Sequence, residues 1–184
     1  PDPTSPEGVA GDPSGLVFSE ICTKNETIIA DDSGRHRDYA ELYNGGAPFC
    51  LDGCYLTDGR GKSQPFSGGT LQTGEYLLVF LGDDLTGFAL GASGGDCLQL
   101  LSSEGAVLVQ ANTIPAEEDQ VMLLQGQEYV LSRDASPGFA NNERGLLAFR
   151  EGWVQENPSL VIGEVLVQNV SSLPDEQGLV CDVI

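Results

Sequence analysis

Positive charge is the scarcest property of this sequence. Its 184 residues include 8 lysines and arginines against 28 aspartates and glutamates, which gives a formal net charge of −20. The acidity is spread along the chain, because residues 16–145 already hold 7 basic and 19 acidic side chains. Nucleic-acid binding needs a basic surface, so we expect no nucleic-acid partner. The main expected effect of the charge is solubility, and cation binding is the alternative.

Long apolar runs and histidines are also lacking. No run of about 18 apolar residues exists, so we expect no membrane insertion. The single histidine, His36, lies between Arg35 and Arg37 in an expected loop. It leaves no credible Ser-His-Asp or Cys-His arrangement for nucleophilic catalysis.

Aromatic residues are few, at 7% of the chain. Trp153 is the one candidate for an exposed carbohydrate platform. Others stand at expected strand positions that a sandwich would bury, among them Phe18, Tyr43, Tyr55, Tyr76 and Phe80.

The five cysteines make a poor disulfide framework, because their number is odd and their spacing irregular. Cys50 and Cys54 have three residues between them and no second cysteine pair, which supports a zinc site only weakly. Cys22, Cys50 and Cys97 lie inside apolar, strand-like runs, whereas Cys181 lies near the end of the chain. We expect buried free thiols.

What the sequence does contain is a repeat at a fixed offset of 144 positions. Residues 17–20 (Val-Phe-Ser-Glu) correspond to residues 161–164 (Val-Ile-Gly-Glu). At the same offset four further pairs are identical: Asn25 and Asn169, Asp31 and Asp175, Gly34 and Gly178, Asp38 and Asp182. An offset held without gaps predicts one complete module followed by the start of a second, as in a piece of a longer tandem protein.

This repeat divides the chain into four parts. Residues 1–15 are rich in Pro, Gly, Ser and Asp and are predicted to be a linker. Residues 16–145 form the expected β-sandwich, residues 146–159 a connector with room for one helical turn, and residues 160–184 the truncated start of the second repeat.

Short apolar runs separated by turn residues predict β-structure in the module. Asp58-Gly59, Glu104-Gly105 and Gln125-Gly126 are turn signals, and residues 98–109 read as the clearest hairpin. About seven to nine short strands with regular turns predict an all-β sandwich. Eight strands are expected at residues 16–23, 39–43, 55–57, 76–81, 97–101, 107–111, 121–124 and 128–131.

The order and spacing of six blocks resemble the lamin tail domain in its bacterial extracellular form. The blocks are Asp-Asp-Ser-Gly at 31–34, Asp-Tyr-Ala-Glu-Leu-Tyr-Asn at 38–44, Leu-Asp-Gly-Cys-Tyr-Leu-Thr-Asp at 51–58, Gly-Glu-Tyr-Leu-Leu-Val-Phe at 74–80, Gly-Gly-Asp-Cys-Leu-Gln-Leu at 94–100 and Ser-Pro-Gly-Phe-Ala-Asn at 136–141. Cys54 stands where the family usually has an aromatic residue, and Ala40 where it has a larger apolar one. Both departures should thin the local core.

The resemblance implies an immunoglobulin-like sandwich that serves as an accessory module of secreted or surface proteins. It provides no shared catalytic residues, and the chromatin contacts of nuclear lamins do not transfer to a chain without a basic surface. We therefore expect a non-catalytic binding or spacer module of an extracellular or cell-surface bacterial protein. Its expected partner is a protein or a cell-surface polymer.

Asp31, Asp32 and Asp38 form the best polar constellation. Oxygen ligands on a turn suit calcium, although the spacing is not that of an EF-hand. The pattern recurs at residues 175–178 with Asp182, which fits a site or simply a tight turn. We expect no cofactor, with calcium as the one candidate. The alternative function is accordingly a calcium-stabilised adhesion or carbohydrate-binding module accessory to an extracellular enzyme.

Two glutamates lie inside expected strands. Glu20, like its counterpart Glu164, either faces solvent or is buried with a hydrogen-bond partner. Glu41 is a candidate for a glycosidase-type acid pair, but no insertion forms the cleft that such a pair needs. Residues 160–167 carry the pattern of a strand without its domain, and they predict strand-mediated self-association.

Overall fold

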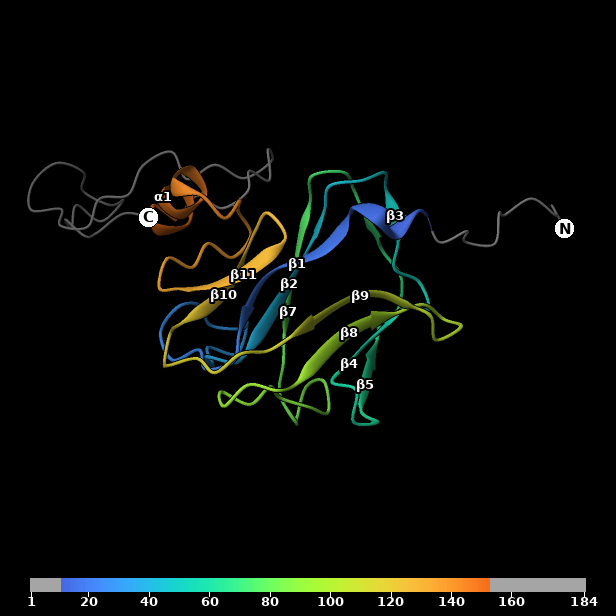
Figure 1. Cartoon of the computed structure of the whole chain (residues 1–184), viewed down its shortest axis with the longest axis horizontal. Helices are drawn as coiled ribbons and strands as arrows, with labels where there is room; N and C mark the ends of the chain where they lie inside the picture. The colour runs from blue at the N-terminus through green and yellow to red at the C-terminus, as the bar shows by residue number, and fades with distance from the viewer. Residues whose placement is uncertain (1–10, 153–184) are drawn as a thin grey trace, which may run out of the picture. The chain divides into compact units, whose positions relative to one another are not determined.

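The computed structural model describes residues 11–152, which form eleven strands and one α-helix (Figure 1). The predicted all-β sandwich is confirmed, with more strands than the seven to nine expected. The strands are β1 Leu16–Cys22, β2 Tyr39–Asn44, β3 Phe49–Cys50, β4 Tyr55–Thr57, β5 Ser63–Pro65, β6 Thr70–Leu71, β7 Tyr76–Phe80, β8 Cys97–Leu101, β9 Val107–Asn112, β10 Val121–Gln125 and β11 Glu128–Ser132.

The larger sheet has five antiparallel strands in the order β11-β10-β1-β2-β7. Strands β1 and β2 lie inside it, so each has a neighbour on both sides. The β10–β11 hairpin turns at the predicted Gln125-Gly126 signal, where Gly126 has a φ of 66° that favours glycine. Strand β7 is an edge, paired with β2 alone within residues 11–152.

The second sheet has four antiparallel strands in the order β5-β4-β8-β9. Its β8–β9 hairpin is the one predicted from residues 98–109, with a register shift between Leu100 and Leu101. A small sheet of β3 and β6 adds one short pair.

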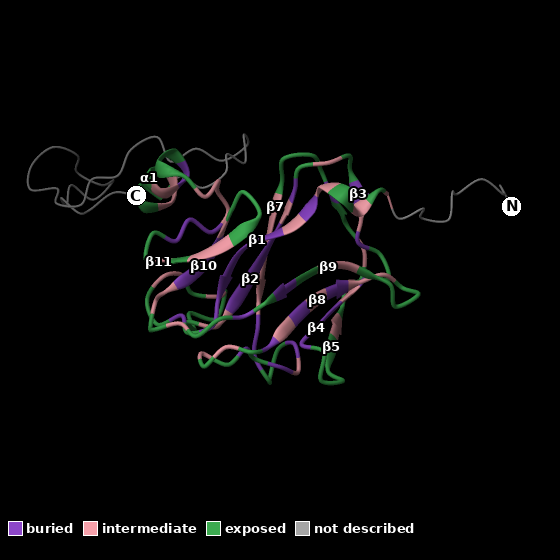
Figure 2. Cartoon of the chain, viewed as in Figure 1, coloured by how far each residue is buried: buried purple, intermediate pink, exposed green. Residues whose placement is uncertain are grey.

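The main core consists of buried apolar side chains from both larger sheets. Figure 2 shows this burial concentrated along β1, β2, β4 and β8. Phe18, Leu42, Leu56, Leu98 and Leu100 are completely buried in it. Ala40 and Cys54, the two small residues predicted to thin the core, also lie in this cluster. They are packed there among larger buried apolar side chains.

A smaller apolar cluster lies on the other, outer face of the five-stranded sheet. It contains Cys22, Tyr39, Val121, Leu123 and Ala135. Ala135 follows the last strand, so the chain after β11 returns over this outer face and covers part of it.

Two short helical elements flank the sandwich. A 3-10 turn, Pro13–Gly15, starts from Asp12, whose side chain accepts a hydrogen bond from the N–H of Ser14. Helix α1, Glu143–Arg150, starts from Asn142, whose side chain accepts a bond of 3.0 Å from the N–H of Gly145. The helix lies across the predicted boundary at residue 145, and the compact unit extends to Gly152.

Candidate functional site

The outer face of the five-stranded sheet carries polar side chains because of a β-bulge at Ser19. Under strict alternation Phe18, which points into the main core, would place Glu20 there too. The register shift between Phe18 and Glu20 makes Ser19 an extra residue, so Ile21 takes the core position and Glu20 turns to the outer face. Glu20 then lies directly opposite Glu41 of β2.

Glu20 is completely buried. Its Oε1 accepts a short hydrogen bond from the hydroxyl of Tyr39, and its Oε2 accepts one of 2.9 Å from the N–H of Ser136. Of the two expectations for this residue, burial with a hydrogen-bond partner is confirmed.

Glu41 is completely buried as well. Its Oε1 accepts a bond of 2.7 Å from the hydroxyl of Ser19, and its Oε2 accepts a short one from the N–H of Gly138. The acid partner considered for Glu41 therefore exists and is Glu20. The four oxygens of the pair all accept bonds from the protein, and none is open to a cleft.

Burial dominates the electrostatics of this carboxyl pair. It raises the pKa of Glu20 to about 7 and that of Glu41 to about 8, against the hydrogen bonds from Tyr39, Ser136, Gly138 and Ser19, which lower both. The charge of Glu20 raises the pKa of Glu41 further. Both shifts favour the neutral acid.

Residues 135–141, here called the covering segment, lie over the pair. Ala135, Ser136 and Pro137 are buried. The side-chain amide of Asn141 donates a bond of 2.6 Å to the main-chain oxygen of Ser19, and its Oδ1 accepts one of 3.1 Å from the hydroxyl of Ser136. Three hydrogen bonds thus join the covering segment to strands β1 and β2, from Ser136, Gly138 and Asn141.

A groove of about 340 Å³ lies beside the covering segment. We call it the tyrosine groove. Its lining includes Val17, Ser19, Tyr43, Tyr76, Leu124 and Asn141.

Tyr43 and Tyr76 form the aromatic wall of this groove. They lie directly opposite each other on β2 and β7, with ring centroids 4.7 Å apart and the planes tilted by 35°. The sequence expectation of burial is wrong for both, because these positions face the outer side of the sheet and each ring is half-buried. It is wrong for the half-buried Tyr55 and Phe80 as well, and right for Phe18. Burial, Tyr43 and the charge of Glu41 raise the pKa of Tyr76 to about 12.

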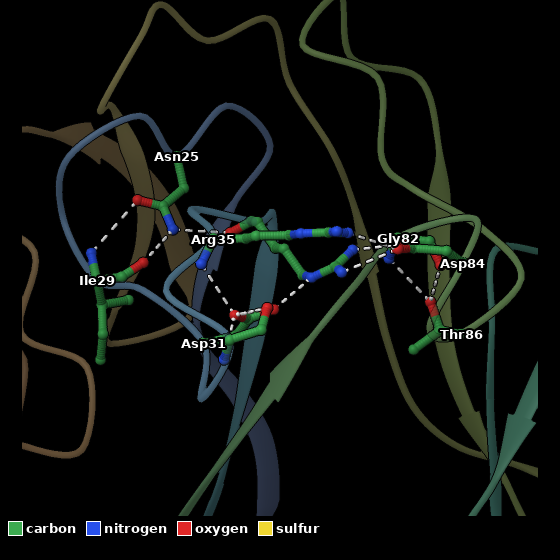
Figure 3. Close-up of polar contacts among 9 residues, drawn as sticks. Asn25, Ile29, Asp31, Arg35, Gly82, Asp84 and Thr86 are labelled. Carbon is green, nitrogen blue, oxygen red and sulfur yellow. Dashed lines mark hydrogen bonds and ion pairs between the residues drawn. The ribbon is translucent and has the colours of Figure 1, made fainter.

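The calcium candidates lie elsewhere, in the loop between β1 and β2. Asp31 is at the centre of a tight turn in Figure 3. Its Oδ1 accepts from the N–H and hydroxyl of Ser33 and from the N–H of Arg35. Its Oδ2 accepts a bond of 2.5 Å from Nε of Arg37. The Ser33 hydroxyl, followed by Arg35 and Arg37, holds the pKa of Asp31 well below its usual range.

Arg37 then connects this turn to the loop after β7. Its Nη1 and Nη2 donate to the carboxylate of Asp84 at 2.5 and 2.9 Å, and Arg35 adds a bond of 3.1 Å to the same group (Figure 3). These charged hydrogen bonds therefore join the two loops.

The other two calcium candidates do not join Asp31. Asp32 is exposed and Asp38 is half-buried; burial raises the pKa of Asp38 to about 6. Within residues 11–152 no group of three or more His, Cys, Asp or Glu side chains is arranged to hold a metal ion.

The remaining reactive side chains are dispersed. His36 is exposed. In the described part of the chain Cys22 and Cys54 are buried free thiols, and Cys50 and Cys97 are half-buried free thiols. Burial raises the pKa of Cys22 to about 12, which makes it unreactive. The predictions on Trp153, residues 160–167, Glu164, the recurrent turn at 175–178 with Asp182, and Cys181 fall outside the described residues.

The sequence matches no protein-family model, and comparisons with curated proteins and with solved structures find no match either. The resemblance to the lamin tail domain stays a prediction. Among residues 11–152 there is no helix with the length and apolar character needed to cross a membrane.

Sequence reasoning missed the pairing of Tyr43 with Tyr76 and of Glu20 with Glu41. Part of the signal was present on β2, where Tyr39, Glu41 and Tyr43 alternate with apolar residues and so share one face. The bulge at Ser19, which no local pattern marks, was needed to place Glu20 on that face too.

Proposed function

We propose that this chain is a non-catalytic binding module of a secreted or cell-surface bacterial protein, and that it binds its partner in the tyrosine groove. The groove is the observation that carries the proposal. It combines two half-buried aromatic rings, Tyr43 and Tyr76, with neighbouring polar atoms of Ser19 and Asn141. Amphipathic aromatic rings of this kind contribute much of the free energy of binding at recognition surfaces.

The arrangement of the acids supports binding over catalysis. A glycosidase acid pair must reach the scissile bond through an open cleft. Each oxygen of Glu20 and Glu41 instead accepts a hydrogen bond within the fold, and both side chains are completely buried.

The charge of the chain restricts the partner. With a net charge of −20, long-range repulsion opposes acidic polymers and favours neutral or basic ones. The side-chain amide of Asn141 already bonds Ser19 and Ser136, and the Ser19 hydroxyl bonds Glu41. The tyrosine rings and their hydroxyls are therefore the groups left for a ligand. An uncharged cell-surface polysaccharide, whose sugar rings present flat apolar faces, fits this chemistry.

A binding screen tests the proposal. Soluble glucan, mannan, xylan and peptidoglycan fragments serve as uncharged or weakly charged probes, in affinity electrophoresis followed by calorimetry of the best one. We expect Tyr76→Ala and Tyr43→Ala each to weaken binding by about tenfold or more, since loss of one aromatic contact costs about 1.4 kcal/mol.

Tyr55→Ala is the matched control. Tyr55 is also half-buried, but it belongs to β4 in the other larger sheet, so binding should be unchanged. Equal losses in all three variants would place the binding surface elsewhere. Binding of a basic protein but of no polysaccharide would identify the partner as protein.

The calcium-stabilised adhesion or carbohydrate-binding module remains the alternative proposal. The tyrosine groove suits its carbohydrate half. Its calcium half has less support, because the oxygens of Asp31 already bind Ser33, Arg35 and Arg37.

A further inference from the structure

We propose that Glu20 and Glu41 form a proton-binding site that holds one proton at neutral pH, on Glu41, and that loss of this proton releases the covering segment from the sheet. The site needs no ligand other than the proton. It is distinct from the tyrosine groove, although it shares Ser19 with that groove.

The first argument is the absence of a compensating cation. Glu20 and Glu41 lie opposite each other on adjacent strands and are completely buried. Within residues 11–152 neither carboxyl is ion-paired with a lysine, an arginine or the histidine. Two like charges so placed and kept dry are strongly unfavourable, so the pair shares a proton, as acid pairs elsewhere do.

The hydrogen bonds decide which carboxyl holds the proton. The hydroxyl oxygen of Ser19 lies 2.7 Å from Oε1 of Glu41 and 3.3 Å from the main-chain oxygen of Glu41. A protonated Glu41 therefore donates from Oε1 to Ser19, and the Ser19 hydroxyl donates onward to that main-chain oxygen. The Oε2 of Glu41 still accepts from Gly138, so every group stays bonded.

Glu20 offers no such arrangement. Its Oε2 faces the N–H of Ser136 and its Oε1 faces the hydroxyl of Tyr39. In the described residues the Tyr39 hydroxyl has no other hydrogen-bond partner. A proton on Glu20 would leave either its own O–H or that of Tyr39 without an acceptor, which is unfavourable in a buried site.

The other titratable groups around the pair do not supply positive charge. Cys22 of β1, Tyr39 and Tyr43 of β2 and Tyr76 of β7 lie on the same face, and none of these residue types is basic. The pKa values of Cys22, Tyr39 and Tyr76 are raised, which keeps these three side chains neutral. Neither β10 nor the covering segment carries an acidic or basic side chain. Titration of this region is therefore that of the two glutamates.

Loss of the proton acts on the covering segment because this segment is held less firmly than the strands beneath it. Strands β1 and β2 each have a hydrogen-bonded partner strand on both sides. The covering segment is joined to them by three hydrogen bonds, from Ser136, Gly138 and Asn141, and by the packing of Ala135. A charged carboxylate accepts hydrogen bonds from N–H groups more strongly than a neutral acid does. The free-energy cost of keeping two adjacent charges away from water is larger than this gain. Lifting the covering segment hydrates both carboxylates.

Hydrogen exchange of the full chain tests the proposal, with Glu41→Gln as the key variant. A glutamine at this position can donate from its amide to Ser19 and accept from Gly138, so it imitates the protonated acid. At pH 9 we expect amides of residues 135–141 to exchange about tenfold faster or more in the wild type than in Glu41→Gln, because opening hydrates a charged Glu41 in the wild type alone. At pH 5, close to the pKa of an ordinary glutamate, the two should nearly agree.

Two further variants sharpen the result. In Glu20→Gln the side-chain NH₂ group must face one of two donors, the hydroxyl of Tyr39 or the N–H of Ser136. This variant should therefore have a lower denaturation midpoint than Glu41→Gln. Glu128→Gln, an exposed change on β11, should behave as the wild type. Equal exchange rates of the wild type and Glu41→Gln at pH 9 would overturn the proposed release of the covering segment. A lower denaturation midpoint for Glu41→Gln than for Glu20→Gln would overturn the assignment of the proton to Glu41.

A measurement on the wild type alone keeps the proposal testable if a variant does not fold. In a carbon-13 NMR titration of the glutamate carboxyl carbons, the buried pair should still be titrating above pH 6. Completion of all glutamate titrations below pH 6 would contradict the proton site. Ser19 and Asn141 also line the tyrosine groove, so the affinity of the groove for its ligand should fall above pH 8. This consequence rests on the proposed function, whereas the exchange and NMR measurements do not.

Discussion

Thr23 is a buried residue whose hydroxyl group forms no hydrogen bond in the described part of the chain. Its side chain follows β1 and is 4% exposed, and its Oγ1 has no hydrogen-bond partner in the described residues. Thr113, equally buried, differs in that its Oγ1 accepts a bond of 3.0 Å from the N–H of Asp96. These two threonines are therefore equally buried, but the hydroxyl of one lacks a hydrogen-bond partner and that of the other has one.

We predict opposite effects of the same substitution at these two positions. Thr23→Val removes a desolvated hydroxyl and should raise the free energy of unfolding by about 1 kcal/mol. Thr113→Val leaves a buried N–H without its acceptor and should lower it by about 1–3 kcal/mol. Urea denaturation of both variants checks the signs; a loss of stability in Thr23→Val would mean that the hydroxyl is bonded after all.

The pH dependence of the stability also arises from single residues. Glu20 and Glu41 have raised pKa values in the folded state, so they contribute stability that is complete below about pH 4.5 and is lost as the pH rises through 7 and 8. We predict that the wild type loses more stability than Glu41→Gln between pH 5 and pH 9. Asp38, whose pKa is also raised, contributes equally to both proteins, so a parallel decline in the two would contradict this prediction.

At the scale of elements, helix α1 depends on one close contact. Gly145 lies in its first turn, and a Cβ added there would lie 1.9 Å from the main-chain oxygen of Ala140. Helix propensity alone would favour alanine over glycine by about 1 kcal/mol. At this site the contact with the end of the covering segment reverses that preference.

We therefore predict that Gly145→Ala destabilises the fold by about 1–3 kcal/mol, as overpacking does. Leu147→Ala, at a position that is 49% exposed on the same helix, should change stability little. Thermal melts of both variants test this. A more stable Gly145→Ala would mean that helix α1 does not pack on Ala140 in solution.

The sequence predicted most of the secondary structure but not all of it. All eight expected strands occur within two residues of their predicted ends, because period-two alternation and turn glycines are local signals. Strands β3, β5 and β6 were missed, since two or three residues are too short to show a period. The bulge at Ser19 and the return of the chain over the outer face depend on contacts distant in sequence, and therefore the tyrosine groove and the acid pair could not be predicted.

At the scale of the whole molecule, the net charge of −20 opposes the compact state. We predict that NaCl raises the melting temperature as the Debye length falls from about 30 Å at 0.01 M to about 8 Å at 0.15 M. Calcium at matched ionic strength should add nothing further, because the Asp31 oxygens are occupied by protein donors.

The contrary result is informative for the alternative function. A rise of several degrees with calcium beyond that with NaCl, lost in Asp32→Asn or Asp38→Asn, would establish a calcium site in the loop between β1 and β2. EDTA provides the metal-free reference. Binding to the native state alone at about 100 times the dissociation constant would add about 2.7 kcal/mol, which is readily detected.

The buried acid pair has a consequence for the apparent charge of the molecule. The formal count treats every glutamate as ionised, but Glu41 takes up a proton when the chain folds, so folding near neutral pH draws about one proton from the buffer. Native electrophoresis should accordingly report one negative charge fewer than the sequence contains. The heat of unfolding should vary with the ionisation enthalpy of the buffer, and in Glu41→Gln this variation should largely disappear.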